Sequence, residues 1–397
     1  MIGRVLKRER EPGSIFEHID SHIRPGVDGL AEGGEKLPDD AIAAEGAIAF
    51  APGALEGVFA GPGDPAEVEA AVDRLYAALE ALAAKPSAGT RRKLRERFRE
   101  GGVRAKIDAL RERLAESPPE HSVRLYPELR ELFLRSGRRD EVKFAMALVS
   151  GFRRSEDADL FRIIGRHDEF TLYAAVALAT VTDDALGEWL ALLPHVSGWG
   201  RTELSGLILR EPRSQLVREQ VARHGLGVGN ALELAVGCRL DELLARADVD
   251  DHAVAGARDI LQSLAADWDS PATLTDYADA GVAVEALLAR LAERDGGLDD
   301  FVAVDDLRSF LAADENRDGD GEGDRFEASG FTAERRARVL AQSAAYLGDA
   351  RWPPLAETFM HGDDGATQWL GTEVASRLGV DLHDHLIALI EADPGDS

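Results

Sequence analysis

Cysteine is almost absent from this chain. Cys238 is the only one among 397 residues, so no disulfide can form within the chain and a reducing compartment is expected. Long apolar runs are missing too, since none approaches the roughly 18 residues that a membrane-spanning helix requires. The basic start MIGRVLKREREPG is not followed by the apolar segment of a secretory signal. These absences predict a cytoplasmic protein with no membrane partner.

Positive charge is scarce relative to negative charge. The chain has 46 basic and 73 acidic residues, which gives a formal net charge of −27. Such a field repels phosphate backbones and anionic membrane surfaces, and it favours cationic partners. The charge therefore disfavours nucleic acid as a partner. An acidic composition can also serve only to keep the protein soluble, with no role in binding a partner. This second interpretation stays open beside the first.

Helical spacing of apolar residues is the clearest pattern that is present, from about Ser155 to Ala265. One stripe combines positions i, i+4, i+8, i+11 and i+12, namely Leu232, Val236, Leu240, Leu243 and Leu244. Helix starts are marked as well: Asp64 can cap a helix whose first residue is Pro65. The alternation of strands with helices that marks a doubly wound sheet is missing, so the pattern predicts an all-α fold.

The spacing of the helices indicates a repeat architecture. One helix pair takes roughly 35 to 45 residues, within the range of HEAT-type units. Because a single pair cannot bury its apolar stripe on both sides, neighbouring pairs must stack and leave a concave surface. We predict an α-α superhelix, a HEAT-like solenoid, over residues 151–397, preceded by a helical segment with a basic patch over 64–150. Residues 1–63 are rich in Gly and Pro and predict an irregular N-terminal arm, either laid against the helices or partly disordered.

Three phrases of the sequence resemble a known family. They are EFTLYAAVAL (Glu169–Leu178), HVSGWGRTELSGLIL (His195–Leu209) and APGALEGVF (Ala51–Phe59). Together they are similar to a family of uncharacterised bacterial proteins with HEAT-like helical repeats, over about residues 45 to 390. The resemblance implies a helical-repeat fold and no particular activity. The family's helix after the Gly-Trp-Gly-Arg corner is more basic and polar than Thr202–Arg210, so a function of that helix does not carry over.

An acidic stretch supplies the best-defined chemical motif. With Asn316 at position 1, it nearly matches the EF-hand loop, in which oxygen ligands alternate along the chain and a glycine folds the loop around Ca²⁺. Asn316 itself and Gly323 at position 8 depart from the template. A solvated acidic loop that binds no metal is the alternative. The candidate calcium ligands are Asn316, Asp318, Asp320, Glu322, Asp324 and Glu327.

The Gly-Trp-Gly-Arg corner is a candidate partner-binding point. Trp199 and Arg201 could present an aromatic ring and a cation to a ligand at the end of a repeat. In the alternative interpretation, Trp199 fills the gap between successive helix pairs and Arg201 caps carbonyl groups at a helix end. The sequence alone does not separate the two.

A basic stretch stands out in the acidic chain. Residues 85–143 carry 17 basic and 10 acidic side chains, most densely over Arg91–Lys106. Nucleic-acid binding is one interpretation, and helical-repeat DNA glycosylases are the enzyme class that it brings into consideration. Glu96 and Glu100 lie between the basic residues. The simpler interpretation is therefore that this stretch docks onto the protein's own acidic helices.

The sequence predicts a non-catalytic scaffold or adaptor. No candidate set of catalytic residues or bound cofactor emerges, while the expected concave face suits a protein or peptide partner, with a cationic one favoured by the charge. A calcium-binding regulatory protein is the first alternative. A helical-repeat DNA-binding protein or DNA glycosylase is the second, and the net charge disfavours it.

Overall fold

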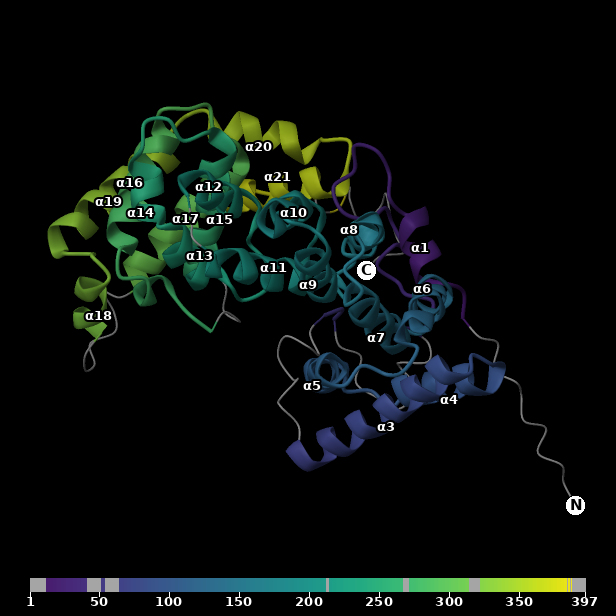
Figure 1. Cartoon of the computed structure of the whole chain (residues 1–397). Coiled ribbons are helices and arrows are strands. Elements are labelled where there is room, and N and C mark those ends of the chain that lie inside the picture. Colours follow the sequence, from purple (N-terminus) through teal and green to yellow (C-terminus); the bar gives the residue numbers. More distant parts are fainter. Residues whose placement is uncertain are drawn as a thin grey trace, which may run out of the picture. The chain divides into compact units, whose positions relative to one another are not determined.

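The chain is helical throughout the part that its structure, a computed structural model, describes. That part comprises residues 12–40, 51–53, 64–211, 214–266, 271–313, 322–383, 385 and 387. It contains 20 α-helices and no strand (Figure 1). The prediction of an all-α fold is confirmed. None of the described helices combines the length and the apolar character needed to cross a membrane.

Backbone contacts divide the chain into two compact units, Met1–Pro212 and Arg213–Ser397. The predicted boundaries at 63/64 and 150/151 both fall inside the first unit. Helix packing explains why no boundary occurs near 150, since α7 on one side of it packs against α9 on the other. The helices of the first unit are α1 (Ile15–Ser21), α3 (Pro65–Ala84), α4 (Ala88–Phe98), α5 (Val103–Glu116), α6 (Leu125–Arg135), α7 (Arg139–Ser150), α8 (Ala158–Ile164), α9 (Thr171–Val181), α10 (Ala185–Leu192) and α11 (Gly198–Arg210), with 3-10 turns η2 (Ser122–Arg124), η3 (Ser155–Asp157) and η4 (Leu193–His195).

Helix α7 is the centre of the first unit. Every residue from Glu141 to Ser150 is buried, which is expected of a helix covered by neighbours on all sides. It packs against α4, α5, α6 and α9. Phe144 of α7 stacks on Phe98 of α4, with ring centroids 4.7 Å apart. The core of the unit is thus built around a single helix that also carries two buried charged side chains, Glu141 and Lys143.

The N-terminal arm, here residues 12–40 and 51–53, is ordered against this body. The prediction gave an irregular arm. The described part of the arm nevertheless contains one helix, α1, which packs on α6 and α8. Phe16 of α1 meets Phe133 of α6 edge to face at 5.7 Å. The predicted start of the next helix is present, because the Asp64 side chain accepts a hydrogen bond from the amide of Ala66 at 3.0 Å and Pro65 opens α3.

The second unit is also built of short packed helices, but one predicted helix is divided into two. The predicted stripe does not run along one helix, because Arg239 adopts φ +53° and separates α13 from α14. The break turns Val236 outward, so that it is 55% exposed, while Leu240, Leu243 and Leu244 are buried. The helices of this unit are α12 (Gln215–His224), α13 (Ala231–Cys238), α14 (Leu240–Ala245), α15 (Asp251–Ala266), α16 (Ala280–Ala292), α17 (Leu298–Ala312), α18 (Glu322–Ala328), α19 (Ala333–Leu347), α20 (Trp352–Met360) and α21 (Gly365–Arg377), with the 3-10 turn η5 (Leu274–Asp276).

The close crossing of α20 and α21 gives a test of the packing. A Cβ on Gly371 would lie 2.4 Å from the amide nitrogen of Met360 and 2.7 Å from the carbonyl carbon of Phe359. We expect Gly371→Ala to lower the free energy of unfolding by about 1–3 kcal/mol in urea denaturation, because the backbone of α20 must move. Gly365→Ala in the same helix is the control, since no described atom lies within 4 Å of its Cβ position. Equal losses in the two variants would contradict the crossing.

Candidate functional site

Three segments that are distant in sequence meet around one polar pocket in the first unit. They are the arm, the α8–α9 turn (residues 165–170) and the corner before α11 (residues 194–201). The pocket, here called the corner pocket, has a volume of about 380 Å³, within the range of small-molecule and peptide side-chain sites. Its polar lining includes Asp28 and Glu35 from the arm, Arg166, His167 and Asp168 from the turn, and His195, Ser197 and Arg201 from the corner.

His167 joins the turn to the arm as a neutral imidazole. Its Nδ1 accepts a hydrogen bond from the backbone amide of Glu169 at 3.1 Å. Its Nε2 lies 3.2 Å from the carbonyl oxygen of Glu35 and therefore donates to it. Burial lowers the pKa of His167, which favours this neutral form. Both ring nitrogens are used, so His167 is a structural link and has no free nitrogen for a ligand.

Glu169 is the acceptor of a buried ion-pair network. Its carboxylate lies 2.5 Å from the ammonium group of Lys143, and the two side chains are only 5% and 2% exposed. The amide of Gly53 in the arm donates a hydrogen bond to the other carboxylate oxygen at 3.0 Å. Burial by itself would raise the pKa of Glu169, but the charges of Lys143 and Arg139 outweigh it and the pKa is lowered. The carboxylate thus stays ionised in the core and holds the arm.

Arg139 fastens the arm at a second point, one helical turn from Lys143 on the same face of α7. Its guanidinium Nη2 donates to Asp39 Oδ1 at 3.0 Å, and its backbone amide donates to Asp39 Oδ2 at 2.9 Å. Asp40 accepts a further hydrogen bond from the same guanidinium group. Paired, hydrogen-bonded charges of this kind hold their geometry because breaking one partner leaves the other buried and uncompensated.

Asp168 lines the corner pocket. Burial raises its pKa to about 6, against the hydrogen bonds that it accepts from the amide and hydroxyl of Ser197. The amide nitrogen of Ser197 lies 3.1 Å from Asp168 Oδ1. The arm and the corner approach this residue so closely that only glycine fits. A Cβ added to Gly53 would lie 2.9 Å from the carbonyl oxygen of Asp168, and Gly53 also has φ +78°. A Cβ added to Gly200 would lie 2.9 Å from the Cα of Asp168. The Ala-Pro-Gly and Gly-Trp-Gly phrases of the sequence therefore meet at one residue, Asp168.

The two residues predicted to bind a partner lie in this corner. Arg201 lines the pocket, and its Nε donates to the carbonyl oxygen of Val196 at 2.8 Å. Burial lowers its pKa, with Asp168 and Asp28 acting in the opposite direction. Trp199 is half-buried, and its Cβ lies 3.1 Å from where a side chain on Gly53 would be. Arg201 thus lines the pocket, whereas Trp199 lies beside Gly53 and is not among the lining residues.

Other polar groups of the pocket retain hydrogen-bonding capacity. The Nδ1 atom of His195 is buried and makes no hydrogen bond to any described group; it lies 3.9 Å from the Asp28 carboxylate. Burial and the nearby Arg166 lower the pKa of His195. The guanidinium of Arg166 has no hydrogen bond or ion pair within the described part of the chain. Sequence reasoning missed His195, Arg166 and Asp168, because single polar residues in separate turns carry no pattern.

The predicted calcium ligands fall largely outside the described residues. Asn316, Asp318 and Asp320 lie there entirely, and of Glu322 and Asp324 only the backbone is described, at the start of α18. Glu327 is exposed on the same helix. Calcium binding by this segment stays a prediction. Across the described ranges, no group of three or more His, Cys, Asp or Glu side chains is placed to hold a metal ion.

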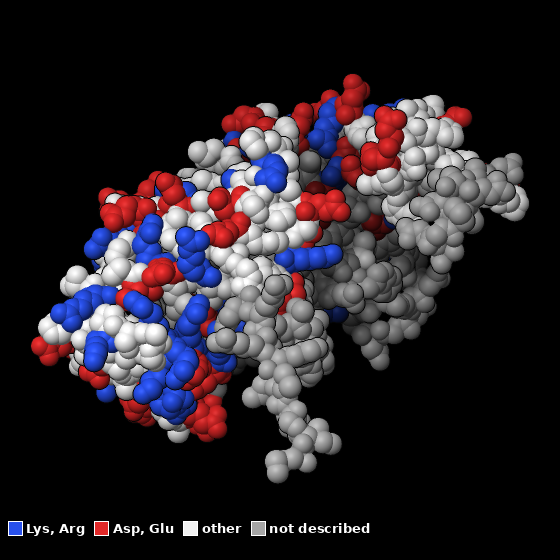
Figure 2. Space-filling model, turned by 90° about the vertical axis from the view of Figure 1, so that its right-hand side faces the viewer, with Lys and Arg blue, Asp and Glu red and all other residues white. Residues whose placement is uncertain are grey.

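The basic stretch is engaged mainly with the protein's own carboxylates. Arg95 of α4 and Arg99, which directly follows that helix, flank the fully buried Glu141 of α7, at 3.1 and 2.5 Å. Arg91 donates to Glu128 of α6 at 2.7 Å. In Figure 2, blue Lys and Arg side chains gather low in the molecule with red ones between them, at the height that α3, α4 and α5 occupy in Figure 1. These pairs agree with intramolecular docking of the stretch.

The buried Lys143–Glu169 pair predicts a large stability effect. Lys143→Met should lower the free energy of unfolding by about 3 kcal/mol, because Glu169 keeps its charge in the core with Arg139 as the remaining cation. The double variant Lys143→Met/Glu169→Gln removes that stranded charge and should recover part of the loss. Urea denaturation of the four proteins of the cycle measures both. A single variant as stable as the wild type would contradict the buried pair.

The raised pKa of Asp168 predicts a pH dependence. The folded protein holds this proton up to about pH 6, while the group's ordinary pKa is 3.8. The folded state therefore binds more protons between these values, and the contribution of Asp168 to stability falls as pH rises from about 4 to 6. Asp168→Asn still accepts from Ser197 and should flatten this slope, gaining about 1–2 kcal/mol at pH 7. Urea denaturation between pH 4 and 7.5 tests this, and an unchanged slope would refute it.

Comparison with known proteins adds no relative. No protein-family model, no curated protein and no solved structure matches this chain. No activity is therefore transferred from another protein, and the corner pocket has to be interpreted from its own residues and their geometry.

Proposed function

We propose that this chain is a HEAT-like α-α superhelix that acts as a cytoplasmic scaffold or adaptor. In this proposal it binds a protein partner with a basic surface and catalyses no reaction itself. The resemblance to helical-repeat proteins at the Gly-Trp-Gly-Arg corner is part of the proposal.

The packing of helices near in sequence is the observation that carries it. In the first unit, α5 packs on α7, α7 on α9, and α9 on α10 and α11. In the second unit, α12 packs on α15, α15 on α17, and α17 on α19 and α21. Stacking between near neighbours is the signature of a solenoid, in which each repeat covers only the next one. Extended stacks of this kind commonly serve as binding surfaces for other proteins.

The charge of the corner pocket supports a basic partner. Asp28 stands at the pocket with its side chain 85% exposed, and Glu35 is exposed beside the same cavity. Asp168 lines the same cavity and has a pKa of about 6, so a cation entering from the partner would favour its ionised form. A lysine or arginine side chain inserted here would meet three carboxyl groups, which outnumber the two guanidinium groups in the same lining, those of Arg166 and Arg201. At longer range, the net charge of −27 would steer a basic protein towards the chain.

A pull-down followed by charge reversal tests this function. Affinity capture from the host lysate should recover a protein with a basic surface, and less of it at high salt. With the purified partner, Asp28→Lys should weaken binding about tenfold, or ~1.4 kcal/mol. Glu120→Lys is the matched control, because Glu120 is similarly exposed (89%) but lies outside the corner pocket. Its affinity should equal that of the wild type.

Two outcomes would count against the proposal. If Asp28→Lys and Glu120→Lys weakened binding equally, the corner pocket would not be the contact and only long-range charge would act. If the captured ligand were nucleic acid, with affinity falling steeply as salt rises, the scaffold proposal would give way to the DNA-binding alternative.

A further inference from the structure

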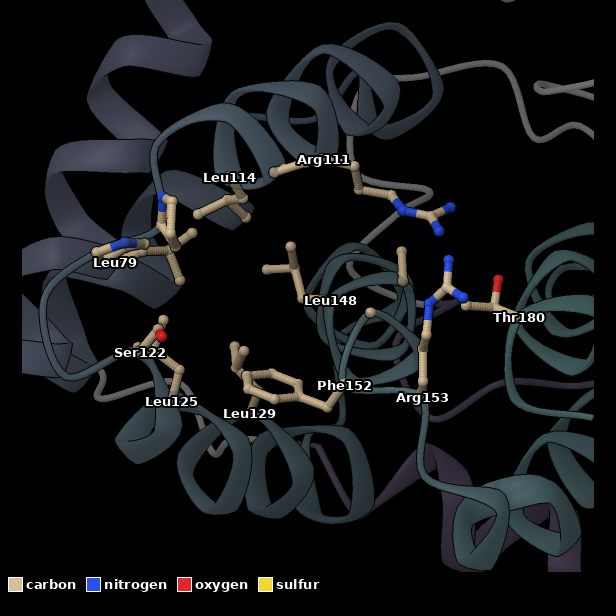
Figure 3. Close-up of a pocket in the computed structure, with 15 residues that line it drawn as sticks. Leu79, Arg111, Leu114, Ser122, Leu125, Leu129, Leu148, Phe152, Arg153 and Thr180 are labelled. Atoms are coloured by element: carbon tan, nitrogen blue, oxygen red, sulfur yellow. The ribbon is translucent and has the colours of Figure 1, made fainter.

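A second pocket lies in the first unit and shares no lining residue with the corner pocket. Its volume is about 370 Å³. Its walls come from α3, α5, α6, α7 and α9 and from the turns that follow α5 and α7. Figure 3 shows leucine side chains on several sides of the opening, with Leu148 at its centre. We call it the leucine pocket.

The body of the leucine pocket is apolar and firmly built. Leu79, Leu125, Leu129 and Leu148 each come from the hydrophobic core and are at most 5% exposed. Leu114 of α5 is half-buried and covers the opposite side. The described lining contains no Asp or Glu, although the chain as a whole carries 73 acidic residues. An apolar chain entering the pocket would therefore meet no carboxylate.

Two arginines make one end of the pocket positive. Figure 3 shows the guanidinium groups of Arg111 and Arg153 at the same end of the cavity, next to Thr180. Neither guanidinium has a hydrogen bond, ion pair or ring contact with any residue that the structure describes. Unpaired arginines beside an apolar cavity are suited to a carboxylate, which a guanidinium binds through two parallel hydrogen bonds.

The sequence neighbours of these arginines behave differently. Arg113 lies over the ring of Tyr76 at 5.4 Å and 3.7 Å from Asp73. Arg154 lies over the ring of Tyr126 at 3.9 Å and 3.2 Å from Glu156. Each of these side chains has both an aromatic and an acidic partner within the protein. Arg111 and Arg153, in contrast, have neither kind of partner within the described residues.

The backbone at Arg153 has an unusual conformation for an arginine. Arg153 follows α7 with φ +53°, in the left-handed region that an arginine occupies at a cost of about 1–2 kcal/mol. Glycine would make the same turn without that cost. At Arg153 the turn places a guanidinium at the end of the pocket, where glycine would leave none.

We propose that the leucine pocket binds a single-chain carboxylate amphiphile, of the fatty-acid class. The carboxylate would lie between Arg111 and Arg153, and the acyl chain would run along the leucines. A neutral alcohol of the same length would leave both guanidinium groups unused, and a cationic amphiphile would be repelled. Residues 85–143, which provide much of the wall, have a surplus of seven positive charges (17 − 10), so the surroundings also favour an anion. This site goes beyond the scaffold function and does not depend on it.

Calorimetric titration of the purified full chain tests the proposal. Decanoate, kept below its micelle concentration, should bind, while decanol and decyltrimethylammonium should bind at least tenfold more weakly. Between hexanoate and decanoate, affinity should rise about fourfold per methylene until the pocket is filled. Arg111→Gln and Arg153→Gln should each weaken decanoate binding about tenfold to a hundredfold.

Matched variants separate the pocket from general charge effects. Arg113→Gln and Arg154→Gln remove the same charge from positions one or two residues away and should leave decanoate affinity unchanged. Ala115→Phe fills the cavity from an exposed position and should abolish binding without loss of folding, as circular dichroism checks. The proposal is overturned if decanoate does not bind the folded wild type, if decanol binds equally well, or if the control variants weaken binding as much as the pocket variants. No protein partner is present in this assay, so its outcome is separate from that of the pull-down.

Discussion

The buried charges of α7 are the constraint on which the first unit depends. Lys143 and Arg139, one turn apart, face Glu169 and Asp39, and through them the arm and the α8–α9 turn are fixed to the central helix. Ionised groups taken out of water are tolerated only when their partners are close and in place. The arrangement therefore makes the position of the arm nearly all-or-none. The corner pocket exists because this docking brings Asp28 and Glu35 next to Asp168 and His195.

Local chemistry was predictable and long-range contact was not. The helical period, the cap at Asp64 and the proline that opens α3 are readable because they depend on residues within one or two turns. The stripe from Leu232 to Leu244 failed at Arg239, where a non-glycine residue adopts a left-handed backbone that spacing alone does not reveal. A helix at Ile15–Ser21 was also missed, because seven residues give too short a period to recognise.

In the candidate site, too, local features could be predicted from the sequence and long-range contacts could not. Trp199 and Arg201 stood out as residue types in an unusual setting, and Arg201 does line a pocket. Asp168, His195 and Arg166 gave no signal, since their importance comes from burial and from segments more than a hundred positions away in the sequence. The glycines around Asp168 did leave a trace, in phrases that resemble another family, but the physical reason for them is a close approach of three backbones. The leucine pocket is similar, because its two arginines belong to turns and helices 42 positions apart.

Where the arm meets the α8–α9 turn, one side contributes side chains and the other contributes backbone groups. The turn supplies the side chains of His167 and Glu169, and the arm supplies the carbonyl of Glu35 and the amide of Gly53. Every residue carries a carbonyl, so the identity of residue 35 can drift over evolutionary time without loosening the joint. Position 167 has no such freedom, because a replacement must supply one donor and one acceptor in the same plane. Related chains, when aligned, should accordingly vary at position 35 and keep histidine at position 167.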